Sequence, residues 1–319
     1  MSSDTIVMNL GGAQRADEIE GLCRGLGLPS PGIDVKTYAS DDLLTLTTPT
    51  LLARFAPCFA HGETRRTNRI TIIGGSHSAF SVVDRLAVEL GCVGLDEIAV
   101  IHRSPIRLFF ETVEEAHANG YAVDEANDIC PVTKRVNRSS GLRYRAFDVA
   151  RSIMAAGHVP GAKPHVELIE TGSGDAARTR ARYCLRNSIA VIHGAGYGPN
   201  LPALVDHCGN AIALQSGQGG LVSDTFGRPF DMNGDVVRGL FSFGLGSGFR
   251  PDEQIGSEAA FHGRIYGVWI FHHAIGAEVL NGVLEALVPA SAEEDVAAAR
   301  DERCSKLPET ARSYAGGAT

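Results

Sequence analysis

The sequence predicts an α/β protein built around a doubly wound parallel sheet. Continuous aliphatic runs such as "RITII" and "EIAVIH" are typical of parallel strands that are covered on both faces. Between these two runs lies a stretch with one apolar face at helical spacing, and a glycine-containing loop joins it to the first run. Strands and helices continue to alternate further along the chain, as they do in repeated strand–helix–strand units.

The individual elements follow from the same pattern of apolar residues, glycines and prolines. A strand at Ile70–Gly75, a helix at Ser78–Leu90 and a strand at Glu97–Ser104 form the central unit. Elsewhere the sequence predicts a strand at Thr5–Gly12, a helix at Asp41–Ala56 broken near Pro49, a helix at Ala146–Ala156, a strand at His165–Thr171, a strand and turn at Thr179–Asn187, a strand from Ser188 into a glycine-rich loop, a similar strand and loop at Gly239–Gly248, and a buried helix at Gly263–Leu287. This succession predicts a Rossmann-like sheet.

The order of these elements divides the chain into three parts. We expect residues 64–186 to form the Rossmann-like domain. Residues 1–63 and 187–290 are expected to fold together as a reduced second domain, built from the N- and C-terminal segments. Residues 291–319 are rich in Ala and Glu and end in "GGAT", which predicts an exposed C-terminal tail.

The composition argues against several classes of function. The net charge is −8 and the chain has no basic run, so we expect no binding to nucleic acid or to anionic membranes. No apolar stretch approaches the roughly 20 residues that span a bilayer, and no basic signal-peptide region opens the chain. The seven cysteines form no C-x-x-C pair, which predicts reduced thiols, no metal site and a cytoplasmic location.

The loop "GGSHSA" after the first central strand has part of a dinucleotide-binding fingerprint. Such a loop uses glycines for its turn, for the approach of the pyrophosphate and for helix–strand packing. Gly74, Ser76 and Ala79 occupy those three positions. The helix N-terminus still offers free N–H groups and a positive dipole end to an anion. The candidate cofactor-binding residues in this loop are Gly74, Gly75, Ser76, His77, Ser78 and Ala79.

The next strand ends in "IHRSPIR", and its basic character bears on the choice of cofactor. NAD-binding proteins place an acidic residue there, whereas an arginine fits the 2′-phosphate of NADP(H). Arg103 and Arg107 therefore favour NADPH, and His102 stands where it could touch the bound nucleotide. Alternatively, these arginines are solvated or pair with acidic side chains that follow them, namely Glu111, Glu114 or Glu115.

The same loop permits a second interpretation, in which it exposes a nucleophile. "GGSHS" nearly matches the G-x-S-x-G turn of serine hydrolases. Ser76 would then be the nucleophile, assisted by a late histidine such as His272 or His273. However, Ser78 replaces the last glycine and crowds the turn. The two histidines lie in an apolar stretch, where a structural role is the alternative.

Taken in order, these motifs resemble a known family, the FAD/NADPH-dependent monooxygenases, and within it the N-hydroxylating and flavin-containing group. "TIVMNLGGAQ" is similar to the strand and glycine turn that lead into the NADPH domain of that family. "ITIIGGSHSAFSVVDRL" is similar to its NADPH loop, and "IAVIHRSPIR" to the arginine-bearing strand that follows. "SIAVIHGAGYGPNLP" resembles its ATGY segment, which makes Gly196 and Tyr197 further candidate cofactor-binding residues. "GLFSFGLGSG" resembles its late flavin-contacting strand.

The resemblance implies an NADP(H)-linked oxidoreductase that acts on a small-molecule substrate, but it identifies no catalytic residue. In that family a separate glycine-rich unit holds FAD, and this chain starts after the corresponding point. We therefore expect NADPH to bind, and FAD only with a partner chain, so that the protein is one part of a split flavoenzyme. The expected assembly is a homodimer or a hetero-oligomer with a flavoprotein. The alternative is a non-catalytic dinucleotide-binding or partner subunit.

Overall fold

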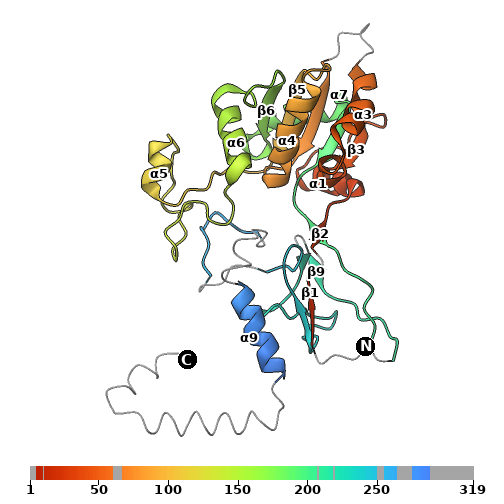
Figure 1. Ribbon diagram of the computed structural model, residues 1–319, viewed down its shortest axis with the longest axis vertical. Coiled ribbons are helices and arrows are strands. Elements are labelled where there is room, and N and C mark those ends of the chain that lie inside the picture. The colour runs from red at the N-terminus through yellow and green to blue at the C-terminus, as the bar shows by residue number, and fades with distance from the viewer. Residues whose placement is uncertain are drawn as a thin grey trace.

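The computed structural model describes residues 5–9, 11–59, 67–206, 208–217, 220–249, 255–263 and 275–287. Its centre is a five-stranded sheet in the order β3-β7-β4-β5-β6, in which every neighbouring pair is parallel (Figure 1). The strands are β3 (Lys36–Ala39), β4 (Arg69–Ile73), β5 (Glu97–His102), β6 (His165–Glu170) and β7 (Ala190–His193). The predicted α/β class with a Rossmann-like parallel sheet is thereby confirmed.

Helices cover both faces of this sheet, which explains the continuous aliphatic strands. Residues Ile70 and Ile72 of β4 pack toward α3 (Thr48–Phe59), α4 (His77–Leu90) and α6 (Tyr144–Ala156). On the other face, Ile73 packs in a second cluster with α1 (Ile19–Gly25) and α7 (Asp175–Asn187). All five residues of β4 are buried, because this strand lies in the middle of the sheet.

Most of the helices and strands predicted around the central sheet match the observed ones, but one assignment is wrong. The segment Thr179–Asn187, expected to be a strand and turn, lies in helix α7. Its buried residues, Ala181, Cys184 and Leu185, recur at intervals of three and four and so share one face of a helix. The long arginine side chains between them cover the opposite face and favour helix rather than strand.

The central sheet extends beyond the expected domain limits of 64–186. Strands β3 and β7, at residues 36–39 and 190–193, pair with each other, and β7 also pairs with β4. The strand at β7 was predicted but assigned to the second domain, and its partner β3 lies about 150 residues earlier in the sequence. The proposed division into two domains otherwise stays a prediction.

The rest of the described chain carries small sheets below the central one (Figure 1). Strand β1 (Ile6–Met8) pairs parallel with β11 (Leu240–Ser242), and helix α9 (Gly276–Leu287) packs on Phe241 of β11. The remaining elements are β2 (Gly12–Ala13), η1 (Ala16–Glu18), α2 (Ser40–Leu44), α5 (Val113–Ala118), η2 (Thr171–Ser173), β8 (Gly198–Pro199), β9 (Ser216–Gly217) and β10 (Gly220–Leu221). Among the described helices, none has the length and apolar character needed to cross a membrane.

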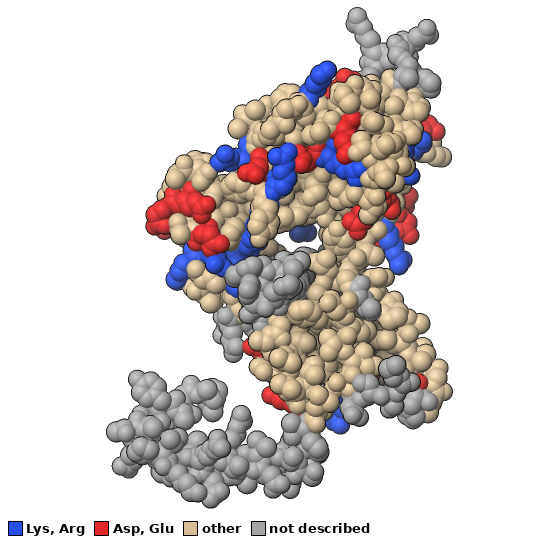
Figure 2. Space-filling view, viewed as in Figure 1, with Lys and Arg blue, Asp and Glu red and all other residues tan. Residues whose placement is uncertain are grey.

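The predicted helix at Gly263–Leu287 is described only in its last part, as α9. Its histidines His272 and His273, and the predicted tail at 291–319, lie outside the described residues. On the face shown in Figure 2, acidic and basic side chains are interspersed over the part that holds the central sheet.

A buried ion-pair network holds the amino-terminal edge of the central sheet. The guanidinium of Arg69, which is only 4% exposed, lies 2.6 Å from the Glu97 carboxylate of the next strand. Arg180 of α7 bridges Glu97 and Glu167 at 2.7 and 2.6 Å. Cys184 lies in the same cluster, where burial raises the pKa of its thiol to about 11. Because two arginines occupy this acidic cluster and the thiol stays protonated, we assign it to structure rather than to metal binding.

We expect Glu97→Gln to lower the free energy of unfolding by roughly 2–4 kcal/mol at pH 7, because it leaves Arg69 buried without its counter-charge. Burial opposes ionisation of Glu97, but the hydrogen bond and charge of Arg69 outweigh it and lower the pKa. The stabilisation is therefore present above the unfolded-state pKa of about 4.3 and disappears as pH falls through the lower folded-state pKa. Urea unfolding followed by circular dichroism at pH 7 and pH 3 measures both effects.

The matched control is Glu111→Gln, which removes a carboxylate that is 57% exposed and 2.7 Å from Arg135. An exposed pair of this kind contributes about 1 kcal/mol or less. Equal losses for the two variants at pH 7, or a Glu97→Gln loss that persists unchanged at pH 3, would contradict the assignment.

Strand β1 leaves apolar side chains in solvent. Ile6 is 54% exposed and Val7 is 48% exposed. Neighbouring residues of a strand point to opposite faces, so both faces of β1 are open at this point. The described residues of this chain therefore leave part of each face of β1 uncovered. A parallel strand pair of this kind is normally covered on both sides, and an exposed apolar edge is prone to pair with another chain.

We expect the chain to associate through β1, with a second copy or with a partner chain. Light scattering at low micromolar concentration should then give a mass well above the 33.8 kDa of one chain. Replacing Ile6 by Lys and Val7 by Thr should reduce that mass, whereas Val88→Lys, at a similarly exposed valine of α4, should not. A mass of one chain for the unaltered protein at these concentrations would refute self-association.

Candidate functional site

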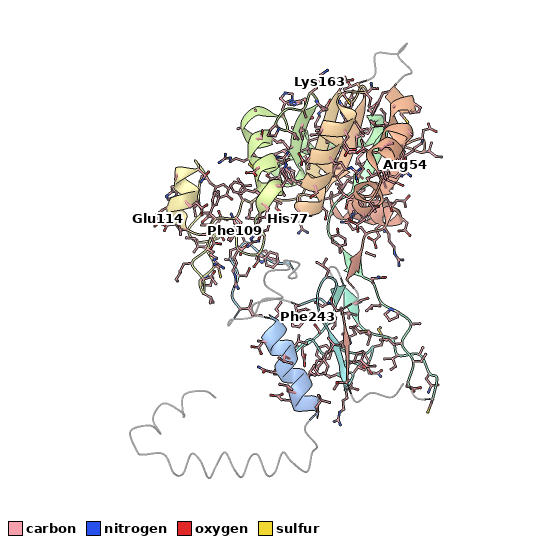
Figure 3. All side chains as sticks on the ribbon, viewed as in Figure 1. Arg54, His77, Phe109, Glu114, Lys163 and Phe243 are labelled. Carbon is pink, nitrogen blue, oxygen red and sulfur yellow. The ribbon has the colours of Figure 1, made fainter. Side chains whose placement is uncertain are left out.

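The candidate site lies at the carboxyl edge of the central sheet, where β4 turns into α4. Ligands of open α/β sheets bind at this edge. Ser76 is the N-cap residue of α4, and its side chain does not cap the helix. The first N–H groups of a 14-residue helix are thus directed toward this loop. In Figure 3, His77 lies at this end of α4, and Phe109 lies beyond it on the same side of the sheet.

Both glycines of the loop are closely packed, Gly74 against backbone and Gly75 against side chains. Gly74 has φ +138°, and a Cβ there would lie 2.3 Å from the carbonyl oxygen of Gly194 after β7. A Cβ at Gly75 would lie 2.7 Å from Ile106 and 3.2 Å from His102. Gly194 in turn faces Ala79, because a Cβ on it would come within 3.0 Å of that residue. The loop is therefore packed between the ends of β5 and β7.

The polar side chains of the loop bind to neighbouring segments rather than to the loop itself. The Ser76 hydroxyl donates to the Gly194 carbonyl at 3.0 Å. The Ser78 hydroxyl donates to the Tyr197 hydroxyl at 3.3 Å, and Tyr197 donates to Asp41 Oδ1 at 2.9 Å. The predicted residue Tyr197 is thus brought to the N-terminus of α4. Its neighbour Gly196, also predicted, has a positive φ of 101°.

His77 joins this loop to the start of α6. Its Nε2 accepts a hydrogen bond from the backbone N–H of Arg143 at 3.0 Å. Burial, together with the positive charge of Arg143, lowers the pKa of His77, which agrees with a neutral ring that accepts at Nε2. The Arg143 guanidinium stacks on Phe109, 3.8 Å from the ring centroid. The sequence alone gave Arg143 no role at this loop, because its link to His77 runs through a backbone amide.

The geometry does not support the hydrolase interpretation. The Ser76 hydroxyl is engaged by a carbonyl oxygen, and His77 Nε2 is engaged by an amide. Among the described residues, no histidine nitrogen is hydrogen-bonded to Ser76. The two late histidines considered as bases fall in a segment that the structure leaves undescribed.

The residues at the end of β5 differ in how far they are available to a ligand. Arg103 is exposed, and within the described part of the chain it forms no ion pair. Arg107 pairs with Asp128 at 3.5 Å. The alternative that it pairs with an acidic side chain therefore holds, but the partner is Asp128 and not one of the glutamates named from the sequence. His102 is 6% exposed and lies beside Gly75. Its Nδ1 lies 2.8 Å from the Ser104 carbonyl and therefore donates, which leaves Nε2 as a buried acceptor with no hydrogen-bond partner among the described residues.

A second polar cluster lies at the end of β7, next to the candidate loop. His193 is buried, and its Nδ1 accepts from the Ala195 amide at 3.1 Å. Its Nε2 therefore donates to Glu18 at 3.1 Å. Burial lowers the pKa of His193 despite Glu18, so the contact is a hydrogen bond donated by a neutral ring rather than an ion pair. This fixes the backbone that carries Gly194 and Gly196.

The residues present fit a dinucleotide. The loop offers Gly74, whose position excludes a Cβ, a helix N-terminus without a side-chain cap, and an exposed arginine after the next strand. The unpartnered Nε2 of His102 adds an acceptor beside the loop. The structure brings the predicted residues Gly74–Ala79, His102 and Arg103 to one sheet edge, with Tyr197 beside them. Cofactor contact by any of them remains a prediction.

The sequence is similar to a curated hydroxylase. It is 29% identical over 286 residues to the CMP-5'-(3-aminopropyl)phosphonate hydroxylase of Streptomyces rubellomurinus (strain ATCC 31215). The chain is related to a hydroxylase. The match covers 89% of this chain and 63% of the relative, so the chain spans less than two thirds of the relative's length. The resemblance to monooxygenases expected from the sequence is thus confirmed as a relationship to a hydroxylase.

Two further comparisons complete this picture. Among solved structures, the chain is similar to L-lysine 6-monooxygenase from Pseudomonas syringae, with a TM-score of 0.40 and 13% identity. That match covers 89% of this chain and 64% of the solved one. No family model matches the sequence.

We expect Gly74→Ala to destabilise the protein by roughly 2–5 kcal/mol, because the methyl group would overlap the Gly194 carbonyl and the backbone would be strained at positive φ. Gly21→Ala, in helix α1, is the matched control: a Cβ there has no heavy atom within 4 Å, so the change should be neutral or stabilising. Thermal unfolding by calorimetry compares the two. A loss below about 1 kcal/mol for Gly74→Ala would refute the tight packing of this loop.

Proposed function

We propose that the chain is an NADP(H)-linked oxidoreductase that takes part in flavin-dependent hydroxylation, with NADPH bound at the carboxyl edge of the central sheet. The loop from Gly74 to His77 carries this proposal, because its glycine-lined turn opens an uncapped helix. The relationship to a hydroxylase supports the reaction class. In such chemistry NADPH supplies a hydride and a bound flavin uses it to activate oxygen for transfer to the substrate.

The protein's own residues would bind and orient the cofactor. The free N–H groups at the start of α4 would donate to the pyrophosphate, whose negative charge the helix dipole favours. The exposed guanidinium of Arg103 would bind the 2′-phosphate by charge-assisted hydrogen bonds. Tyr197 and Asp41 hold Ser78 in place beside this loop. Catalytic side chains are not assigned.

The substrate proposed is a small molecule that carries an amine. The relative's name specifies hydroxylation of an aminopropyl phosphonate linked to CMP. We extend only the chemical class, an amine on a small anionic molecule, to this chain. FAD would be held together with a partner chain, and the exposed edge of β1 favours such a partner. That edge also favours the second candidate function, a dinucleotide-binding subunit of a larger enzyme.

We expect Arg103→Ala to weaken NADPH binding by about 1–3 kcal/mol and to leave NADH binding almost unchanged, because only NADPH carries the 2′-phosphate. Isothermal titration of the intact chain with each dinucleotide measures both affinities. Arg186→Ala, at an exposed arginine in the last turn of α7, is the control and should change neither. Equal losses for the two dinucleotides would refute the assignment of Arg103 to the 2′-phosphate. If the unaltered chain bound neither dinucleotide, the proposed function would be refuted.

A further inference from the structure

One carboxylate, Glu258, comes from a distant part of the sequence and contacts the turn that precedes α6. It is 1% exposed and belongs to the described segment 255–263, in the C-terminal part of the chain. Its partners lie near residue 140, in the long excursion that leads from β5 to α6. A buried carboxylate is costly unless donors surround it. The identity of those donors therefore shows what this side chain holds in place.

The donors to Glu258 are two consecutive backbone amides of one turn and two serine hydroxyls. The Ser139 N–H lies 3.1 and 3.0 Å from its two oxygens, and the Ser140 N–H lies 2.7 Å from Oε1. The Ser140 hydroxyl adds a bond of 2.6 Å, and the Ser257 hydroxyl one of 3.3 Å. Because two consecutive amides are fixed, the carboxylate determines the path of the main chain and not only a side-chain rotamer.

A second contact fastens the same turn to the same segment. The Arg138 guanidinium, from a residue that is 4% exposed, donates to the carbonyl oxygens of Ile255 and Gly256. Arg138 and Glu258 thus reach in opposite directions, each from one segment to the backbone of the other. We call this pair of contacts the clasp.

The turn held by the clasp leads directly to His77. The Arg138 carbonyl accepts from the Arg143 guanidinium at 2.5 Å. The backbone N–H of Arg143 then donates to His77 Nε2 at the first residue of α4. A path of hydrogen bonds therefore runs from Glu258 through five residues of backbone to the candidate loop.

We infer that Glu258 is a positioning residue for the candidate dinucleotide site: it fixes the turn at residues 138–143 and, through the Arg143 amide, the side chain of His77 at the start of α4. The clasp makes the geometry of that loop depend on a segment that follows it by more than 100 residues. The part of this inference that concerns cofactor affinity rests on the proposed function. The part that concerns His77 does not.

The titration of His77 tests the path without any cofactor. The intact protein should show a His77 pKa below the ordinary value of about 6.5. In Glu258→Gln the new amide N–H₂ opposes the turn's own N–H groups, so the Arg143 amide should withdraw and the pKa should rise toward 6.5. NMR titration of the ring signals of the full chain, assigned with a His77→Gln variant, measures this shift. The charge of Arg143, whose backbone N–H contacts His77 at the start of α6, also lowers this pKa, and it is present in every variant.

Cofactor affinity provides the second readout. We expect Glu258→Gln to weaken NADPH binding roughly 3- to 30-fold. Glu258→Asp, which keeps the charge, should recover part of the affinity, and it also serves if Glu258→Gln does not fold. Ser257→Ala is the matched control: it removes a hydroxyl that donates to Glu258 and to the Ser139 hydroxyl, but it leaves both amide contacts of the carboxylate in place. The His77 pKa should then stay lowered, and NADPH affinity should stay within twofold of the unaltered chain.

The outcomes separate this inference from the proposed function. A raised His77 pKa together with weaker NADPH binding supports the positioning role. A lower unfolding temperature with unchanged His77 titration and unchanged NADPH affinity would overturn it and leave Glu258 a purely structural residue. If the unaltered chain binds no NADPH, the proposed function fails, while the His77 titration still decides whether the path exists.

Discussion

The close contact between Gly74 and Gly194 is the constraint on which the candidate site depends. Two parallel strands end side by side, and the chain must turn away from both within a few residues. A Cβ on Gly74 would lie within 2.3 Å of the Gly194 oxygen, so only glycine permits the β4 loop to pass so near to β7. Ser76 then uses the same oxygen as its acceptor. The turn, the start of α4 and the segment after β7 are therefore positioned together, and Tyr197 follows from that arrangement.

The two edges of the central sheet are built from different interactions. At the amino edge, Arg69 and Arg180 both pair with Glu97, and Arg180 also pairs with Glu167, so that two positive charges meet two negative ones. At the carboxyl edge, the helix N-terminus of α4 has no side-chain cap, and Arg103 has no carboxylate partner among the described residues. The carboxyl edge thus offers an uncapped helix N-terminus and an exposed arginine to an anion. The nearby carboxylates of Glu18 and Asp41 are hydrogen-bonded to His193 and Tyr197.

Local patterns in the sequence were sufficient for the central unit and also indicated α6, β6 and β7, but they missed β3 and misassigned α7. The aliphatic runs and the helical spacing between them predicted β4, α4 and β5, because these features are encoded within about 35 consecutive residues. Helix α7 was predicted wrongly, because only three of its residues are buried and arginines lie between them in the sequence. Strand β3 was missed because its partner β7 lies far along the chain. The pairing of Arg107 with Asp128 and the reach of Glu258 likewise depend on tertiary contacts that no local pattern records.

Among the described residues, two sets of contacts link the part of the chain below the central sheet to the start of α4. The first is the short antiparallel pair β2–β8, where Gly12 packs so closely on Tyr197 that a Cβ would lie 2.5 Å from its Cβ. The second is the clasp of Arg138 and Glu258, which acts through His77. One connection contacts α4 at Ser78 and the other at its first residue. A shift of the smaller sheets against the central one would therefore strain the hydrogen bonds of Ser78 or His77. Both residues lie at the start of α4.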